Sequence, residues 1–202
     1  MPHPADVPVR LQPALFLDRD GVINEEVGYL HRWEDVRFVD GIVSLIQQAN
    51  QLGFFTCVVT NQAGIGRGLY SQADFDRLMD RMQTELLSQG ARLDAVYSSP
   101  YHPIHGLGEY QRETECRKPR PGMMLSAAAD HHLDLAHSLM VGDRCSDMQA
   151  AVAAGIPHRL LFRSHDDMPC PEDIAYTVIT HIYQIRQELQ RLAMALERLN
   201  IM

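Results

Sequence analysis

Short apolar runs alternate with longer stretches of helical spacing along most of this 202-residue chain. Apolar runs bounded by polar or turn-forming residues predict buried strands, over residues 14–18, 54–60, 93–99, 138–143 and 158–162. Apolar residues spaced three or four apart predict helices, over residues 41–53, 71–90, 121–132 and 146–155. Strands that alternate with helices indicate a parallel sheet covered on both faces. The pattern therefore predicts an α/β fold built on a Rossmann-like, doubly wound parallel sheet.

Polar residues and glycines mark the expected ends of these helices. Asp40 and Ser146 stand where an N-cap side chain accepts a hydrogen bond from the first helical turn. The sequence SQAD at residues 71–74 has the form of a capping box. Gly53 and Gly155 follow helical stretches and are expected to end them in a left-handed conformation.

The two ends of the chain are expected to lie outside the main domain, residues 14–180. Residues 1–13 are rich in proline and predict an irregular arm. Over residues 181–202 we expect an amphipathic helix, because apolar residues alternate spacings of three and four, at Ile182, Ile185, Leu189, Leu192, Leu196 and Leu199. This apolar face could pack on its own domain, or it could form a short heptad seam between two chains.

Composition and charge narrow the range of partners. The net charge of −8 argues against a nucleic-acid binder, which needs a basic surface to neutralise phosphates. No apolar run reaches the 18 residues of a membrane span, and the N-terminus lacks the apolar region of a signal peptide. We therefore expect a cytoplasmic protein, monomeric or weakly homodimeric, that binds neither nucleic acid nor membrane. A small phosphorylated ligand in a local cationic pocket stays compatible with this charge.

Four cysteines occur in the chain, at positions 57, 116, 145 and 170. None of them forms a C-x-x-C pair, so neither a disulfide framework nor a zinc ribbon is indicated. For a cytosolic protein the expectation is that all four are reduced thiols.

Polar side chains stand where several predicted strands end, at Asp18, Thr60, Ser98–Ser99 and Asp143. Ligands of parallel α/β sheets bind outside the carboxyl ends of the strands, so we expect these residues to share one edge. The D-x-D of DRDGVIN, residues 18–24, could be a solvated surface turn, a cation site, or a nucleophile with an acid–base partner. Asp143 could likewise be a helix cap. Three converging carboxylates, Asp18, Asp20 and Asp143, favour hard-oxygen binding of Mg²⁺.

Lys118 is the one lysine among 18 basic residues, the other 17 being arginines. It precedes the helix that follows the third predicted strand, between the acidic motifs. A compact ammonium there can balance carboxylates and hold a phosphoryl oxygen, where the larger guanidinium favours bidentate contacts. The glycine-rich stretch VVTNQAGIGRG, residues 58–68, adds backbone that allows close approach of a ligand.

These stretches in this order resemble the haloacid-dehalogenase-like (HAD-like) phosphohydrolases. FLDRDGVIN, VVTNQAGIGRG, CRKPRPGM and VGDR look most like the group of D-glycero-D-manno-heptose-1,7-bisphosphate 7-phosphatases and histidinol phosphatases. The resemblance covers residues 14 to about 160. About 40 residues separate the first two motifs, which leaves no room for a large cap domain, so the fold is expected to be capless. Specificity would then depend on loops 24–35, 62–70 and 100–116.

The resemblance also implies roles for individual residues. Asp18 would be the nucleophile that forms a phosphoaspartyl intermediate, and Asp20 the acid–base that protonates the leaving oxygen and then activates water. Mg²⁺ would bind the carboxylates of Asp18 and Asp143 and the backbone carbonyl of Asp20, with Asp147 supporting the site. Thr60 and Lys118 would hold the phosphoryl oxygens. The implied substrate-binding residues are Glu26, Tyr29, Asn61, Gln62, Arg117 and Arg144.

One feature departs from that group, whose members usually carry a zinc-binding C-x-H…C-x-C loop before the lysine motif. The matching positions here are Ser99, Tyr101, Thr114 and Cys116, and a lone cysteine cannot assemble a tetrahedral site. Substitution by His102 and His105 is a weaker alternative, because their spacing does not fit. We therefore expect no zinc, and a loop held instead by its prolines and by packing of Tyr101, Ile104, Leu107 and Tyr110.

Three functions are compatible with these residues. The leading one is a Mg²⁺-dependent phosphatase acting on a heptose bisphosphate in surface-glycan synthesis, such as that of lipopolysaccharide or capsule. Arg117 together with Arg144 favours a substrate with a second anionic group over histidinol phosphate, the alternative substrate. The third is a non-catalytic binding protein on the same fold, which would require the loss of a catalytic group that the sequence retains.

Overall fold

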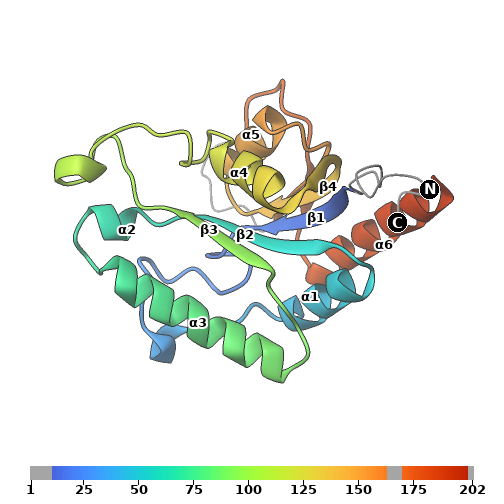
Figure 1. The fold of residues 1–202 in the computed structure, drawn as a ribbon, viewed down its shortest axis with the longest axis horizontal. Helices are drawn as coiled ribbons and strands as arrows, with labels where there is room; N and C mark the ends of the chain where they lie inside the picture. Colours follow the sequence, from blue (N-terminus) through green and yellow to red (C-terminus); the bar gives the residue numbers. More distant parts are fainter. Residues whose placement is uncertain (1–10, 163–169, 200–202) are drawn as a thin grey trace, which may run out of the picture.

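A six-stranded sheet runs through the middle of the computed structural model, which describes residues 11–162 and 170–199 (Figure 1). Its strands are β1 (Gln12–Leu17), β2 (Phe55–Asn61), β3 (Ala95–Ser99), β4 (Leu133–Gly142), β5 (His158–Phe162) and β6 (Thr177–Ile179). They lie in the order β3-β2-β1-β4-β5-β6, and every pairing is parallel. The chain winds outward from β1 in both directions, which confirms the predicted α/β fold with a doubly wound sheet.

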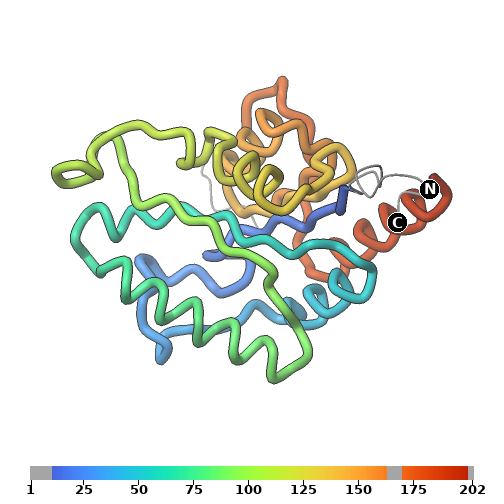
Figure 2. The backbone as a smooth tube through the Cα atoms, viewed as in Figure 1, coloured from blue at the N-terminus to red at the C-terminus, as the bar shows by residue number. Residues whose placement is uncertain are grey.

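Helices cover both faces of the sheet (Figures 1 and 2). On one face lie α1 (Ile42–Gln51), α3 (Gln72–Ser88) and α6 (Ile182–Arg198), and on the other lie α4 (Gly122–His131) and α5 (Cys145–Ala153). Leu15 and Leu17 of β1 pack toward the first group, whereas Ala14 and Phe16 pack toward the second. A strand buried on both faces reads as a continuous apolar run. Burial of each large apolar side chain stabilises the fold by about 1.5–3 kcal/mol.

Two strands differ from the expectation. β4 begins at Leu133 rather than at residue 138, although polar residues interrupt its first half. Buried Ser138 fits there because its hydroxyl accepts a hydrogen bond from the backbone amide of Ala14, where the β1–β4 register shifts. The short edge strand β6 was not predicted, because three residues carry too little pattern.

Helix ends were predicted in part. The capping box between Ser71 and Asp74 is present and opens α3. Asp40 is not an N-cap, because Gly41 occupies that position with a φ of 84°. Ser146 is not one either, because α5 begins after Arg144, whose backbone amide donates to the Asp147 carboxylate at 3.0 Å. A one-turn helix that was not predicted, α2 (Ala63–Gly66), lies within the glycine-rich stretch.

The C-terminal helix packs on its own domain. Its apolar seam is buried, including Ile185, Leu189 and Leu196 at 0% exposure, and it joins the cluster formed with α1 and β4. This confirms the intramolecular alternative for those residues, while Leu199 stays exposed. Residues 1–10 of the expected arm lie outside the described residues, and the rest of that arm already contains the start of β1 at Gln12.

Two of the four cysteines are joined, contrary to the expectation of reduced thiols. Cys145, the first residue of α5, forms a disulfide with Cys170, and their Cα atoms lie 5.3 Å apart. Cys57 and Cys116 are free. The pair is 25 residues apart in the chain, so no short motif signals it. Only the packing of Cys170 into the apolar cluster around α5 brings the two sulfurs together.

No separate cap domain interrupts the fold between β1 and β2. The described segment between them holds a 3-10 helix, Trp33–Asp35, and α1. The segment between β1 and β2 therefore places no cap domain over the carboxyl edge of the sheet, as a capless fold requires. Among the described helices, none combines the length and the apolarity that crossing a membrane needs.

Candidate active site

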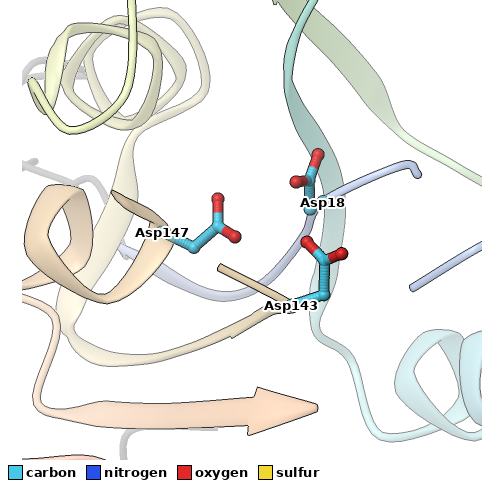
Figure 3. Close-up of side chains that lie close together, drawn as sticks. All are labelled: Asp18, Asp143 and Asp147. Atoms are coloured by element: carbon cyan, nitrogen blue, oxygen red, sulfur yellow. The ribbon is translucent and has the colours of Figure 1, made fainter. Parts of the chain in front are cut away.

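Three aspartates meet at the carboxyl edge of the sheet (Figure 3). Asp18 directly follows β1 and Asp143 directly follows β4, and these strands are neighbours. Asp147 reaches the same point from the first turn of α5. One carboxylate oxygen of each lies within 4.8 Å of the others, and all three residues are buried. Within residues 11–162 and 170–199, no other cluster of His, Cys, Asp and Glu is close enough to hold a metal ion.

Negative charge is costly at this position. Burial raises the pKa of Asp18 to about 7, although the ammonium of Lys118 opposes the shift. Burial also raises the pKa of Asp143 to about 8, and the charges of Asp18 and Asp147 add to it. A divalent cation would stabilise the ionised carboxylates, and carboxylate oxygens are the ligands that Mg²⁺ prefers. The residues present therefore fit a magnesium site.

Two glycines make room for the aspartates. A Cβ on Gly21 would collide with the Asp143 carboxylate, and a Cβ on Gly142 would collide with the side chain of Asp147. These positions must therefore lack a side chain for the carboxylates to reach the site. The glycines of DRDG and VGD are thus explained by close approach.

Lys118 balances the cluster from a buried position, with its side chain 3% exposed. Its Nζ lies 3.0 Å from Asp18 Oδ2 and 2.5 Å from Asp147 Oδ1, and it donates to the Val59 carbonyl at 2.8 Å. Burial alone would lower the pKa of Lys118, but the charges of Asp147 and Asp18 outweigh burial and raise it. The ammonium therefore stays charged beside the predicted nucleophile.

Asn61 holds the backbone of Lys118 in place across 57 residues of sequence. Its side-chain Nδ2 donates to the Lys118 carbonyl at 3.0 Å, and its Oδ1 accepts from the Lys118 amide at 3.1 Å. Asn61 was predicted to bind substrate, and it does line the cavity described below. In this structure its amide is committed to positioning the lysine.

Asp20 is surrounded by hydrogen-bond donors. Arg19 donates to both of its carboxylate oxygens, from Nε at 3.1 and 3.2 Å and from a terminal nitrogen at 2.8 and 2.9 Å. Asn24 donates to Oδ1 at 2.9 Å, and Gln62 donates to Oδ2 at 3.0 Å. The carboxylate is 19% exposed, whereas the side chain of Arg19 is fully buried beneath it.

Gln62 links the acid–base candidate to its surroundings. Besides Asp20, its amide donates to the Thr60 hydroxyl at 2.9 Å, and its carbonyl accepts from the Tyr70 hydroxyl at 2.5 Å. Gln62 is 2% exposed. Like Asn61, it was predicted as a substrate contact, and here its polar atoms are used inside the protein.

A cavity of about 720 Å³ opens above these residues. Ten of the residues singled out in the sequence line it: Asp18, Asp20, Glu26, Tyr29, Thr60, Asn61, Gln62, Arg117, Lys118 and Arg144. Asp143 and Asp147 do not line it and lie buried behind Asp18. The cavity is also lined by Arg67, Tyr70 and His102, which lie in the loops expected to set specificity but were not themselves predicted to bind substrate.

Three arginines bring positive charge to the cavity wall. Arg144 lies 3.6 Å from a carboxylate oxygen of Glu26. Arg117 donates to the Tyr101 carbonyl at 2.9 Å, and Arg67 donates to the Tyr29 hydroxyl with its guanidinium 5.1 Å from the centre of that ring. Within residues 11–162 and 170–199, neither Arg67 nor Arg117 forms an ion pair with a carboxylate. Two cationic groups thus face the cavity without an anion of the described chain beside them.

The loop that carries Tyr29 has an unusual backbone. Tyr29 has a φ of 48°, a left-handed conformation that is uncommon for residues other than glycine. The preceding turn is closed by the amide of Gly28, which donates to Glu26 Oε1 at 2.7 Å. Such conformations cluster where surrounding contacts hold them, often beside ligand sites. Here they turn the Tyr29 ring toward Arg67.

Three of the four positions that matched a zinc loop form a hydrogen-bonded group. Cys116 Sγ lies 3.3 Å from the Ser99 hydroxyl and 3.2 Å from the Thr114 hydroxyl. His102 and Cys116 do not fall in a common ligand cluster among the described residues, and His102 Nδ1 accepts the backbone amides of residues 104 and 105.

Packing of the same loop was predicted only in part. The rings of Tyr101 and Tyr110 lie 5.7 Å apart. Ile104 and Leu107 do not pack as expected, because they are 70% and 62% exposed. Backbone hydrogen bonds hold this stretch instead, including that from Leu107 to the Gly66 carbonyl at 2.7 Å.

The missed residues carried weak signals. Arg67 stands inside the glycine-rich stretch, whose glycines indicate a backbone role and give no sign that the arginine side chain faces a ligand. Arg19 stands between two aspartates, where an arginine looks like a solvated neighbour. Tyr70 and His102 lie outside the matched motifs. Their loops were expected to set specificity, but only the path of these loops in the structure places the two side chains at the cavity.

Comparison with known proteins agrees with the motifs. A family model described as HAD-hydrolase-like matches residues 115–165. The chain is 52% identical, over 76% of its length and 81% of the relative's, to the D-glycero-alpha-D-manno-heptose-1,7-bisphosphate 7-phosphatase of Burkholderia mallei. The chain belongs to the heptose-1,7-bisphosphate 7-phosphatase family. A second member, named for the beta anomer, from Escherichia coli K12, is 40% identical over 89% of this chain and 94% of its own length.

Solved structures place this family member on the same fold. It superimposes with a TM-score of 0.76 on the D,D-heptose 1,7-bisphosphate phosphatase of B. bronchiseptica, which was crystallised with magnesium and phosphate. That protein is 28% identical, and the match covers 89% of this chain and 99% of the other. A putative HAD-like phosphatase from Mesorhizobium loti, 34% identical, gives a TM-score of 0.79 over 94% and 88% of the chains.

Proposed function

We propose that this protein is a phosphatase that removes the 7-phosphate from D-glycero-D-manno-heptose 1,7-bisphosphate. The observation that carries the proposal is that Asp18 and Lys118, backed by the buried Asp143, lie in a cavity whose walls hold three arginines. The identity of the sugar is taken from the names of the relatives. A role in heptose supply for surface glycans such as lipopolysaccharide is part of the same proposal.

The chemistry follows from the positions of the side chains. Asp18 attacks the phosphorus of the 7-phosphate, the bond from phosphorus to the sugar oxygen breaks, and a phosphoaspartyl group forms on Asp18. Asp20 gives its proton to the leaving sugar oxygen and then takes one from the water that hydrolyses the phosphoaspartate. Lys118 and Thr60 stabilise the phosphoryl oxygens, because they are buried and already oriented.

The carboxylates of Asp18 and Asp143, with the backbone carbonyl of Asp20, would hold Mg²⁺. Bound there, the ion would neutralise charge on the phosphoryl oxygens and on the aspartates. Asp147 has a different task in this structure, because it forms an ion pair with the ammonium of Lys118 and accepts a hydrogen bond from the amide of Arg144. We propose no zinc for this protein, since hydroxyl groups of Ser99 and Thr114 surround the lone Cys116.

The cavity suits a substrate with a second anionic group better than it suits histidinol phosphate. One phosphate is served by Lys118 and Thr60, which leaves Arg67 and Arg117 on the wall for another, while Arg144 lies beside Glu26. The second candidate, a non-catalytic binding protein, is disfavoured because each group that the chemistry needs is present at the carboxyl edge of the sheet. We further propose that the enzyme acts in the cytoplasm as a monomer or weak homodimer and binds no nucleic acid.

Steady-state kinetics test the proposal. Phosphate release from both anomers of the heptose bisphosphate is compared with release from histidinol phosphate, with and without Mg²⁺. We expect a higher kcat/KM for the bisphosphate, dependence on the metal, and loss of activity in Asp18→Asn. An equal or higher kcat/KM for histidinol phosphate would contradict the choice of substrate, and an active Asp18→Asn would contradict the mechanism.

A further inference from the structure

Arg19 is a fully buried arginine that neither the motifs nor the proposed mechanism uses. A buried guanidinium is expensive to desolvate and is normally held by several specific contacts. Here one terminal nitrogen donates to the Leu30 carbonyl at 3.0 Å, and the guanidinium carbon lies 5.5 Å from the centre of the Phe75 ring. Arg19 is therefore enclosed by the loop at residues 24–35 and by α3.

The contacts of Arg19 with Asp20 are geometrically specific. Its Nε and one terminal nitrogen form a fork that meets both carboxylate oxygens at 2.8–3.2 Å. A two-point contact fixes the plane of the carboxylate as well as its distance, which a single ammonium cannot do. Because the fork is anchored to the Leu30 carbonyl, the orientation of Asp20 is tied to the loop at residues 24–35.

We propose that Arg19 is the positioning residue for Asp20, orienting the acid–base carboxyl group toward the leaving oxygen of the bound substrate. This inference rests on the proposed phosphatase function. Arg19 does not line the cavity, so it acts through Asp20 and touches no substrate. Asn24 and Gln62 assist from the sides, one on each oxygen. General acid–base groups need such fixed geometry, because their contribution depends on reach to the transferred proton.

The test compares a substrate that needs its leaving group protonated with one that does not. Arg19→Met and Arg19→Lys are assayed on the heptose bisphosphate and on 4-nitrophenyl phosphate, at enzyme concentrations that resolve slow turnover. For Arg19→Met we expect kcat on the sugar to fall about 10²-fold or more, with KM within about threefold, because acid–base catalysis contributes about 10²–10⁴-fold. On the aryl phosphate, whose leaving group departs as a stable anion, the rate of 4-nitrophenol release in the first turnover should fall less than about fivefold, because Asp20 activates water only after that release.

Controls separate positioning from folding. Arg77→Met removes an exposed arginine whose partner Asp74 lies on the surface of α3, and it should leave both activities unchanged. Arg19→Lys keeps the charge but not the fork, so it should show the same difference between substrates with a smaller loss, even where the methionine variant fails to fold. Circular dichroism and thermal unfolding establish that each assayed variant is folded.

Two results would overturn the inference. One is a loss of first-turnover 4-nitrophenol release as large as the loss on the sugar in folded variants, which indicates a general structural role. The other is a raised KM with kcat unchanged, which indicates a role in binding. Failure of the wild-type enzyme to hydrolyse the bisphosphate is a different outcome, because it contradicts the proposed function itself.

Discussion

Lys118 and Asp147 form a buried ion pair, with 2.5 Å between the ammonium nitrogen and a carboxylate oxygen. Asp147 lies one helical turn beyond Asp143, and its side chain is 1% exposed. The pair orients the ammonium so that the same nitrogen also reaches Asp18 at 3.0 Å. Asp147 therefore shapes the site through the lysine.

Replacing Lys118 by Met should abolish most activity and destabilise the metal-free protein. Loss of a preorganised charge at the phosphoryl group lowers kcat by about 10²–10³-fold, and breaking a buried ion pair costs about 3–5 kcal/mol. Kinetics and urea unfolding measure the two effects. Arg92→Met, which removes an exposed partner of Asp94, serves as the control and should change neither. Wild-type kcat in Lys118→Met would contradict the role given to the ammonium.

The contribution of Asp18 and Asp143 to the stability of the metal-free protein should fall as pH rises from about 4 to about 8. The pKa of Asp18 is raised to about 7 and that of Asp143 to about 8 in the folded state, so these two groups bind more protons in the folded protein than in the unfolded chain over this window. Stability contributed by the protonated carboxyls is complete below about pH 4 and is lost as pH rises through the folded pKa values.

Added Mg²⁺ should reverse that loss, because it stabilises the ionised carboxylates. The rise in melting temperature with Mg²⁺ should therefore grow from pH 5 to pH 8. Differential scanning fluorimetry at constant ionic strength measures it, with Asp143→Asn as the comparison. A shift that is the same at every pH, or is retained in full by the variant, would argue against a site at these carboxylates.

Arg67→Met should weaken binding of a bisphosphate more than that of a monophosphate. A hydrogen bond between charged groups contributes about 1.5–3 kcal/mol, which corresponds to about a 10- to 100-fold rise in KM. The matched substrate is the heptose 7-phosphate, which lacks the second phosphate. Tyr29→Phe removes only the hydroxyl that receives Arg67 and should give a smaller rise. Equal increases of KM for both substrates would exclude a contact with the second phosphate.

The disulfide predicts the number of reactive thiols. Protein unfolded without a reductant should expose two thiols, from Cys57 and Cys116, and reduction should release two more from Cys145 and Cys170. Titration with a thiol reagent counts them, and peptide mapping assigns the pair. Cys57→Ser should lower the first count by one. Four reactive thiols before reduction would contradict the disulfide.

The order of strands and helices, and the placement of Asp18, Thr60 and Asp143 at strand ends, followed from the sequence alone. The reason is that the spacing of apolar side chains, which marks strands and helices, is a local property of the sequence. In a parallel sheet all strands end at the same edge, so polar residues that follow buried strands must meet there. Lys118 could also be singled out as a candidate site residue, because the chemistry of one lysine among arginines differs from theirs. The predicted N-caps at Asp40 and Ser146 were wrong, because a neighbouring residue occupies the N-cap position in each helix.

Only the tertiary structure decided how the side chains pair. Asn61 and Lys118 are 57 residues apart, and Gln62 and Asp20 are 42 apart, so the path of the intervening loops determines whether they meet. The same holds for Cys145 with Cys170. The burial of Arg19 likewise depends on the Leu30 carbonyl and on α3, which no local pattern reports. The sequence thus determined which groups reach the edge of the sheet, and the packing of distant segments decided which of them hold the others in position.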